Sequence, residues 1–169
     1  MEVDGMTTNR ILLDDPLCDG RQSEMATRVW RGTARLLRAR GFACVAEVTL
    51  ASGRRADLAA IGPGGEIWIV EVKSSLADLR ADAKWPEYRA HCDRLFFASH
   101  ADVGIDPFPA DAGFILSDGF GAEVLREAPE HRLVAARRKA VTLRIAHAAA
   151  NRLHDALDPD LRSVSFDML

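Results

Sequence analysis

The sequence predicts an α/β domain, and the prediction depends on how its apolar residues are spaced. Three short segments, residues 43–50, 54–61 and 66–73, alternate apolar and polar residues and are bounded by glycine turns, as β-strands with a buried face are. Two longer segments, residues 23–40 and 133–157, place apolar residues three and four positions apart, which is the period of an amphipathic helix. Strands that are preceded and followed by helices are typical of α/β folds.

The first predicted helix begins at an N-cap near Ser23 and ends at Arg40, because Gly41 follows. One of its faces is apolar, and another carries arginines at spacings of three and four. These arginines are Arg28, Arg31, Arg35 and Arg38. They form either a nucleic-acid contact or an ordinary solvated face, on which Glu24 would support Arg28 one helical turn away.

Two tight turns determine how the three strands pair. Residues 51–53 and 63–65 are three-residue loops with glycine third, the position that needs a left-handed backbone in such hairpins. If the residues that flank each loop oppose one another, Glu47 lies opposite Asp57, and Asp57 lies opposite Glu71. One row across the predicted sheet therefore carries three carboxylates.

This row predicts a bound cation. Directly opposed residues have Cβ atoms about 4.5 to 5.5 Å apart, and like charges so close are destabilising unless protons or a cation neutralise them. Lys73 follows Glu71 at the strand period of two, so its ammonium lies on the same face. The opposite face carries Trp68, Val70 and Val72 and is the expected core side. The alternative is a solvated pair of Glu71 with Lys73 on an exposed strand, since a single motif match is weak.

The rest of the chain adds elements around these strands. Ser74 and Ser75 cap a second helix that runs to about Lys84, and Trp85-Pro86 restarts it. The later elements are a buried strand at 95–98, a loop at 100–111, a hairpin of 113–117 and 122–126, and the helix at 133–157, whose buried side carries Val141, Ile145, Ala149 and Leu153.

Length and composition indicate one globular unit. The chain has 169 residues, of which 48% are hydrophobic and 28% charged, and a formal net charge of -3, which is ordinary for a globular protein. We expect residues 1–21 to form an arm, residues 22–158 the domain and residues 159–169 a tail. The sequence shows no leader-like start and no apolar run of about 20 residues. Its three cysteines are widely spaced, so we expect a protein of the reducing cytoplasm.

Two motifs resemble the PD-(D/E)XK nuclease superfamily. Ala56-Asp57 stands where that superfamily has an acidic residue on its second strand, and Glu71-Val72-Lys73 stands where it has E-x-K on the third. The usual proline is replaced by Ala56, a departure that leaves the ligand unchanged. The resemblance implies a restriction-endonuclease-like αβββαβ core, with a mixed sheet flanked by helices, here extended by an extra hairpin and a long C-terminal helix.

Longer segments look like the MmcB-related DNA repair proteins of bacteria, over roughly residues 23–155. The segments that carry this likeness are 53–58, 66–75, 84–88, 92–98 and 127–132. Several long segments are more specific than a lone E-x-K triplet, which arises by chance on charged strands. The resemblance implies a role in DNA repair, with DNA and other repair proteins as expected partners.

Together the two resemblances imply a deoxyribonuclease that depends on Mg²⁺ or Mn²⁺. Asp57 and Glu71 would hold the ion through carboxylate oxygens, with the backbone carbonyl of Val72 as a third ligand. The ion would polarise the phosphate and acidify a bound water. Lys73 would orient that water or stabilise charge on the phosphorane, helped by a neighbouring ion that lowers its pKa.

Other residues are expected around this site. Glu47 is the candidate for an additional acid, as a direct ligand or as an acceptor for metal-bound water, and Glu24 on the first helix is its rival. The candidate DNA contacts are Arg28, Arg31, Arg35, Arg55 and Lys84, and arginine is the side chain that grips phosphate bidentately. The alternative function is a non-catalytic module that keeps the nuclease fold and binds DNA or a partner.

Overall fold

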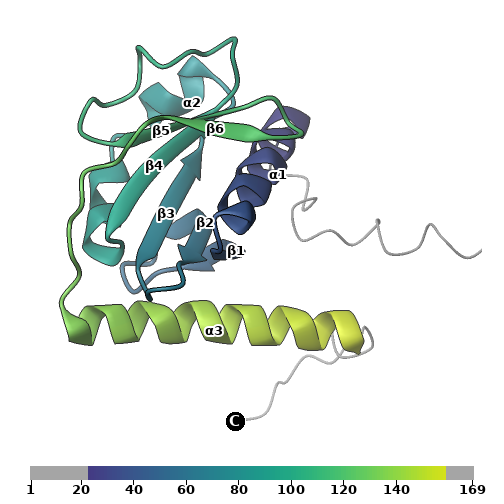
Figure 1. The fold of residues 1–169 in the computed structure, drawn as a ribbon, viewed down its shortest axis with the longest axis vertical. Helices are drawn as coiled ribbons and strands as arrows, with labels where there is room; N and C mark the ends of the chain where they lie inside the picture. Colours follow the sequence, from purple (N-terminus) through teal and green to yellow (C-terminus); the bar gives the residue numbers. More distant parts are fainter. Residues whose placement is uncertain (1–22, 159–169) are drawn as a thin grey trace, which may run out of the picture.

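The computed structural model describes residues 23–158, which form a six-stranded sheet with helices on both faces (Figure 1). The elements in chain order are α1 (Glu24–Ala39), β1 (Ala43–Thr49), β2 (Arg55–Ile61), β3 (Ile67–Val72), α2 (Leu76–Ala81), the 3₁₀ helix η1 (Trp85–His91), β4 (Arg94–Ser99), β5 (Gly113–Ser117), β6 (Ala122–Arg126) and α3 (Ala135–Leu157). The predicted α/β fold is confirmed. The expected arm, residues 1–21, and the expected tail, residues 159–169, lie outside the described residues.

The strands follow one another across the sheet in chain order, from β1 to β6. β1, β2 and β3 form an antiparallel meander, β4 and β5 run parallel to β3, and β6 returns antiparallel to β5. A parallel step needs a crossover longer than a hairpin, and α2 with η1 supplies it between β3 and β4. The sheet is therefore mixed, as predicted, and β3, β4 and β5 all end at the same edge.

The predicted register of the first three strands is confirmed. Thr49 pairs with Arg55 and Ala46 with Leu58 across β1 and β2, and Leu58 pairs with Val70 across β2 and β3. The glycines that end the two turns have φ angles of 81° and 82°, the left-handed backbone that this hairpin loop requires.

α1 covers one face of the sheet. Ser23 caps the helix as predicted, because its Oγ accepts a hydrogen bond from the amide of Ala26 at 3.1 Å. Gly41 follows the helix with a φ of 85°. The buried side of α1, with Val29 and Leu37, packs on the face of β3 that the sequence marks as the core side.

The other face of the sheet is buried as well. Ile67 and Ile69 of β3 belong to one apolar cluster with Tyr88 of η1 and with Val141 and Ile145 of α3. As a result every residue of β3 is buried, as is usual for a strand with a parallel neighbour. The carboxylate row of β3 thus lies at the end of a second core and not on an open strand face.

A buried carboxylate holds α3 to the sheet. Asp93 accepts hydrogen bonds from the amides of Ile67 at 2.7 Å and Leu133 at 2.8 Å, and it binds both terminal nitrogens of Arg138 at 2.6 and 2.8 Å. Burial by itself would raise the pKa of Asp93, but Arg138 and the two amides outweigh it, so the pKa is lowered. Asp93 is therefore a charged structural anchor.

The far end of α3 departs from the prediction. The apolar spacing places Leu153 on the buried side, whereas its side chain is 62% exposed. A helix of this length spans about 35 Å, and Figure 1 shows its last turns running past the sheet. Arg152 instead makes the contact there, donating hydrogen bonds to the carbonyls of Ala46 and Glu47.

Among the helices of residues 23–158, none is both long enough and apolar enough for a membrane span.

Candidate active site

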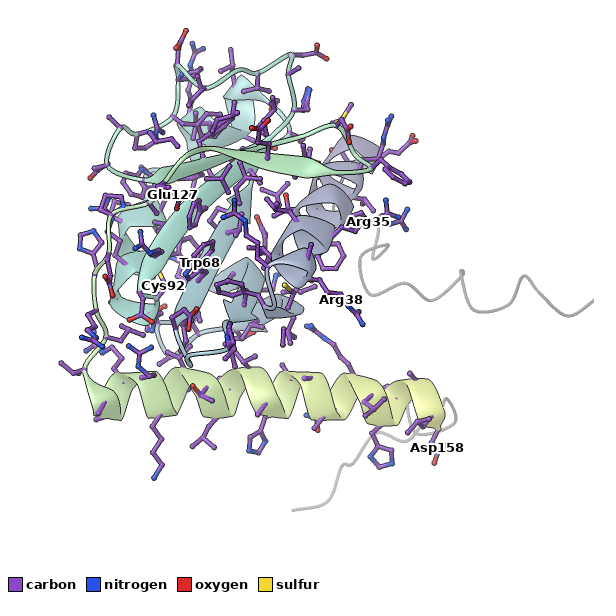
Figure 2. All side chains as sticks on the ribbon, viewed as in Figure 1. Arg35, Arg38, Trp68, Cys92, Glu127 and Asp158 are labelled. Atoms are coloured by element: carbon purple, nitrogen blue, oxygen red, sulfur yellow. The ribbon has the colours of Figure 1, made fainter. Side chains whose placement is uncertain are left out.

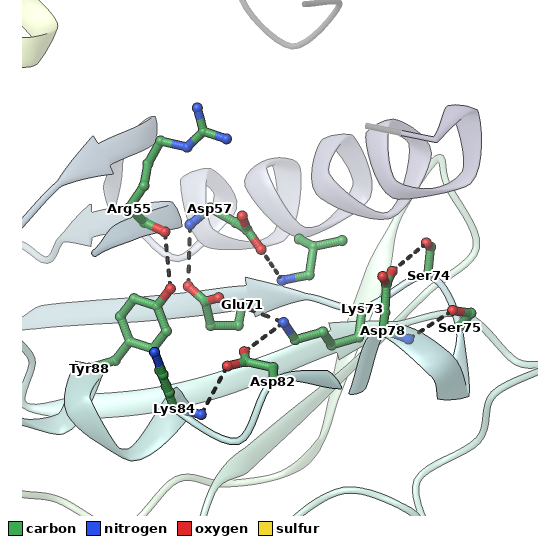
Figure 3. A network of polar contacts seen from close by, with 11 residues as sticks. Arg55, Asp57, Glu71, Lys73, Ser74, Ser75, Asp78, Asp82, Lys84 and Tyr88 are labelled. Carbon is green, nitrogen blue, oxygen red and sulfur yellow. Dashed lines mark hydrogen bonds and ion pairs between the residues drawn. The ribbon is translucent and has the colours of Figure 1, made fainter. Parts of the chain in front are cut away.

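β2 and β3 separate at the row of carboxylates that the register predicts. Their last pair at this end is Leu58 with Val70. Beyond it, the amide of Val72 donates to Oδ2 of Asp57 at 2.8 Å, and the amide of Asp57 donates to Oε1 of Glu71 at 3.3 Å (Figure 3). The two side chains replace the carbonyl acceptors that a continuing ladder would supply. Asp57 and Glu71 therefore lie side by side, as the sequence predicts.

Burial makes both carboxylates hard to ionise. Burial raises the pKa of Asp57 from its ordinary 3.8 to about 6, against the opposing effects of the Val72 amide and the Lys73 ammonium, and the charge of Glu47 adds to the rise. Glu71 is 2% exposed, and burial, followed by the charge of Asp57, raises its pKa well above the ordinary range. When no cation is present, these shifts favour the neutral over the charged form of both carboxylates.

Lys73 projects into the same site. It is 9% exposed, and its Nζ lies 4.0 Å from Oε2 of Glu71 and 2.7 Å from Oδ2 of Asp82. Burial alone would lower the pKa of Lys73, but the hydrogen bond to Asp82 and the charge of Glu71 outweigh it, so the pKa is raised. In this state Lys73 is an ammonium suited to donating hydrogen bonds. The lower pKa expected beside a bound ion stays a prediction.

Asp82 is the site residue that the sequence analysis does not identify. It follows α2 as its C-cap, and its Oδ1 accepts a hydrogen bond from the amide of Lys84 at 3.3 Å. No motif marks this position, because the carboxylate reaches Lys73 only after α2 turns the chain back toward β3. The feature that could have identified Asp82 is its position, because it is an acidic residue at the end of the short helix that directly follows the E-x-K strand.

These side chains open into a polar cleft of about 720 Å³ between the β1–β2 turn and η1. The basic residues at its rim are Arg54, Arg55 and Lys84. Arg54 pairs with Glu87 of η1 at 2.9 Å, and the hydroxyl of Tyr88 donates to the carbonyl of Arg55 at 3.1 Å. Two of the predicted DNA contacts, Arg55 and Lys84, therefore border the cleft.

Glu47 lies beside the buried pair. Its carboxylate lies 3.2 Å from the guanidinium of Arg55, and its negative charge contributes to the raised pKa of Asp57. Its φ of 46° is a left-handed conformation uncommon outside glycine, and it interrupts the pairing of β1. Within residues 23–158, no group of three or more His, Cys, Asp or Glu side chains is arranged to hold a metal ion. Glu24, the rival acid, is exposed in the first turn of α1, so proximity to Asp57 favours Glu47.

The predicted arginine stripe lies on another part of the molecule. Arg28, Arg31 and Arg35 are exposed on α1, which covers the face of the sheet opposite to η1. Figure 2 shows Arg35 and Arg38 along the outer side of this helix. α1 contacts the site through Trp30, whose Nε1 donates to a backbone carbonyl of β2 at 3.3 Å. The predicted DNA contacts therefore form two groups, one at the cleft and one on α1.

Comparison with known proteins identifies the family. The model of the MmcB-like DNA repair proteins matches residues 13–160. The chain belongs to the MmcB-like family. A solved structure similar to this family member is the SPO1766 protein of unknown function from Silicibacter pomeroyi, which is 41% identical over 87% of this chain and 99% of that chain, with a TM-score of 0.81. A comparison with curated proteins finds no match. The family resemblance is thereby confirmed, and the superfamily resemblance stays a prediction.

The buried carboxylates predict how stability depends on pH. Because the pKa of Asp57 is raised in the folded protein, its contribution to stability is present at low pH and is lost as pH rises toward that raised value. We expect Asp57→Asn to match the wild type near pH 4 and to exceed it at pH 7 by about 2 kcal/mol in the free energy of unfolding. Urea unfolding in metal-free buffer measures the difference, with the exposed Asp106→Asn as control. A wild-type protein more stable than Asp57→Asn at pH 7 would contradict this account.

Proposed function

We propose that this chain is a metal-dependent deoxyribonuclease of DNA repair that hydrolyses phosphodiester bonds. The observation that carries the proposal is the meeting of Asp57, Glu71 and Lys73 in one polar cleft with basic side chains at its rim. The family supports the coarser statement of a DNA repair role. The proposal of DNA hydrolysis goes beyond that statement and rests on the chemistry of the cleft.

The donor set at the cleft suits Mg²⁺ or Mn²⁺. Carboxylate and backbone carbonyl oxygens are the hard ligands that these ions prefer. The amide of Val72 points toward Asp57, and since the amide and carbonyl of a strand residue point to the same edge, the Val72 carbonyl faces the same gap. The raised pKa values of Asp57 and Glu71 also indicate a place where a cation would be favoured. When bound, such an ion supplies a Lewis acid and an acidified water.

The chain's own residues would bind and orient the substrate. Lys73, held by Asp82, would place its ammonium against a phosphate oxygen or the attacking water and stabilise the developing negative charge. Arg55 and Lys84 would hold the neighbouring phosphates at the rim. Glu47 would accept a hydrogen bond from a water molecule beyond the direct ligands. Asp82 is in this scheme a positioning residue that acts through Lys73.

A non-catalytic DNA-binding module is the second candidate. The observation that favours it is that Asp57 and Glu71 already accept backbone amides where β2 and β3 separate. That structural task would remain in a protein without chemistry, and exposed arginines on α1 bind phosphate without any metal. Metal binding separates the two candidates, because only the nuclease needs a cation.

Metal binding should stabilise the folded protein. An ion present at 100 times its Kd raises the free energy of unfolding by about 2.7 kcal/mol, which a thermal shift assay with Mn²⁺ or Mg²⁺ would register as a clear rise in Tm. Asp57→Ala should abolish this rise, because it removes a ligand carboxylate. Asp106→Ala, which removes an exposed acid, should keep it. An unresponsive wild type, or an Asp57→Ala variant that still responds, would remove the support for the metal site.

Cleavage should depend on Lys73 far more than DNA binding does. We expect Lys73→Ala to reduce Mn²⁺-dependent cleavage of flap, nicked and single-stranded DNA at least about a hundredfold, since it removes a charge aimed at the reacting phosphate. Asp82→Asn should reduce it less, because Lys73 is loosened but present. Gel assays measure cleavage and anisotropy measures affinity. Cleavage that persists at the wild-type rate in Lys73→Ala would come from another site.

The arginine stripe of α1 can be tested through salt dependence. A side chain that neutralises one phosphate contributes about one to the slope of log K against log salt. We expect Arg31→Gln and Arg35→Gln each to lower the slope of DNA binding by about that amount. Arg132→Gln, an exposed arginine before α3, is the control. If the slopes of the Arg31→Gln and Arg35→Gln variants equal that of the control, the arginine stripe faces solvent and does not contact DNA.

A further inference from the structure

The turn that joins β5 to β6 presents an exposed aromatic ring beside the arginines of α1. Phe120 is 78% exposed, more than any other described large apolar side chain. The guanidinium of Arg35 lies 4.6 Å from the centroid of its ring, and Nη1 of Arg35 donates to the carbonyl of Phe120 at 2.8 Å. A cation over one side of the ring leaves the remaining surface open to a ligand.

The backbone of this turn is held by a compact set of contacts. Oδ1 of Asp118 accepts the amides of Phe120 at 2.8 Å and Gly121 at 2.7 Å, and Oγ of Ser117 donates to the carbonyl of Gly121 at 3.0 Å. The turn packs directly on α1, where a Cβ added to Gly32 would lie 2.4 Å from the Gly121 carbonyl oxygen. A ring presented on a prearranged backbone binds a ligand at low entropic cost.

The turn lies at the edge of the sheet that also carries the candidate active site. β3, β4 and β5 are parallel, so they end along one edge of the sheet (Figure 1). Lys73, His100 and Asp118 directly follow these three strands in the chain. Nε2 of His100 lies 3.0 Å from the carbonyl oxygen of Ser74. This contact links the segment that follows β4 to the segment that follows β3. Neighbouring strands are about 4.8 Å apart, so roughly 10 to 15 Å separate Lys73 from the turn, a distance that a few nucleotides span.

The charges around the ring favour a nucleic acid over a purely apolar partner. Arg28 and Arg35 lie on either side of the point where α1 meets the turn, and Arg28 lines a pocket of about 460 Å³ with His100. Three acids, Asp102, Asp118 and Glu123, also line this pocket. Asp118 is held by the turn amides and by the charge of Arg28, which lower its pKa, and Asp102 lies 3.5 Å from Nδ1 of His100. An aromatic ring among arginines is the arrangement that stacks a base and neutralises its phosphate.

We propose that Phe120 is a stacking platform for an unpaired DNA base, with Arg28 and Arg35 contacting the adjacent phosphates, so that the protein prefers single-stranded or flap DNA to a duplex. Bases inside a duplex are stacked on one another and must be extruded before they can stack on a side chain. The direction of the strand toward the cleft rests on the proposed nuclease function, whereas stacking on Phe120 requires neither metal nor cleavage.

Binding measured in EDTA with the full chain tests this inference. The probes are a fluorescent oligothymidylate and a duplex of the same length, followed by anisotropy. We expect Phe120→Ala to weaken binding of the single strand about tenfold or more and binding of the duplex less than about twofold. Phe120→Trp should retain the wild-type preference. Leu125→Ala, which truncates a 46% exposed side chain on the same hairpin, should change neither affinity.

A salt series distinguishes stacking from charge. Phe120→Ala should lower the affinity for the single strand at every salt concentration with an unchanged slope, whereas Arg28→Gln should lower the slope by about one. The inference is overturned if Phe120→Ala loses no more affinity than Leu125→Ala, if single-strand and duplex affinities fall alike, or if the wild type shows no preference for the single strand. Thermal unfolding checks each variant, and Phe120→Leu, which keeps apolar bulk without a planar ring, replaces a variant that does not fold.

A parallel Mn²⁺ cleavage assay keeps this inference separate from the proposed function. A protein that cleaves DNA but binds it equally well without the ring of Phe120 contradicts the stacking platform alone. A protein that needs the ring for single-strand binding but does not cleave contradicts the nuclease alone.

Discussion

Two carboxylates replace the sheet hydrogen bonds where β2 and β3 part, and the rest of the site depends on this exchange. A buried amide must find an acceptor, and here Asp57 and Glu71 each accept an amide from the neighbouring strand. The exchange lets the strands separate without leaving donors unpaired. It also holds two acids together at the end of an apolar core, where burial destabilises their charged forms. A structural requirement and a concentration of negative charge therefore coincide.

The surroundings only partly balance that charge. Lys73 lies between Glu71 and Asp82 but is closer to Asp82, so its ammonium is shared with a third acid. The pKa of Asp57 and that of Glu71 stay raised in spite of this neighbour. A further positive charge would therefore be favoured at this site, and a proton and a divalent ion would compete for the same place. The pKa of Lys73 is raised as well, so this residue keeps its proton and its positive charge beside the two acids.

The basic residues that are candidate DNA contacts are divided between two surfaces. Arg55 and Lys84 stand at the rim of the cleft on the η1 side, whereas Arg28 and Arg35 belong to α1 on the other face of the sheet. The common edge formed by the ends of β3, β4 and β5 connects the two surfaces. In the proposed binding mode a single DNA strand laid along this edge would meet both surfaces. A net charge of -3 is compatible with such local positive regions.

Local spacing in the sequence determined the strands, the hairpin register and hence the contact of Asp57 with Glu71, because three-residue turns ending in glycine leave little freedom in how adjacent strands pair. The same period of two placed Lys73 beside them. The sequence did not determine the role of Asp82, the exposure of Leu153 or the placing of Phe120 beside Arg35. These depend on how α2 crosses over, how far α3 extends past the sheet and how the last hairpin packs on α1. Such contacts join residues far apart in the chain, and they are decided by the packing of whole elements, for which no local period or turn carries a signal.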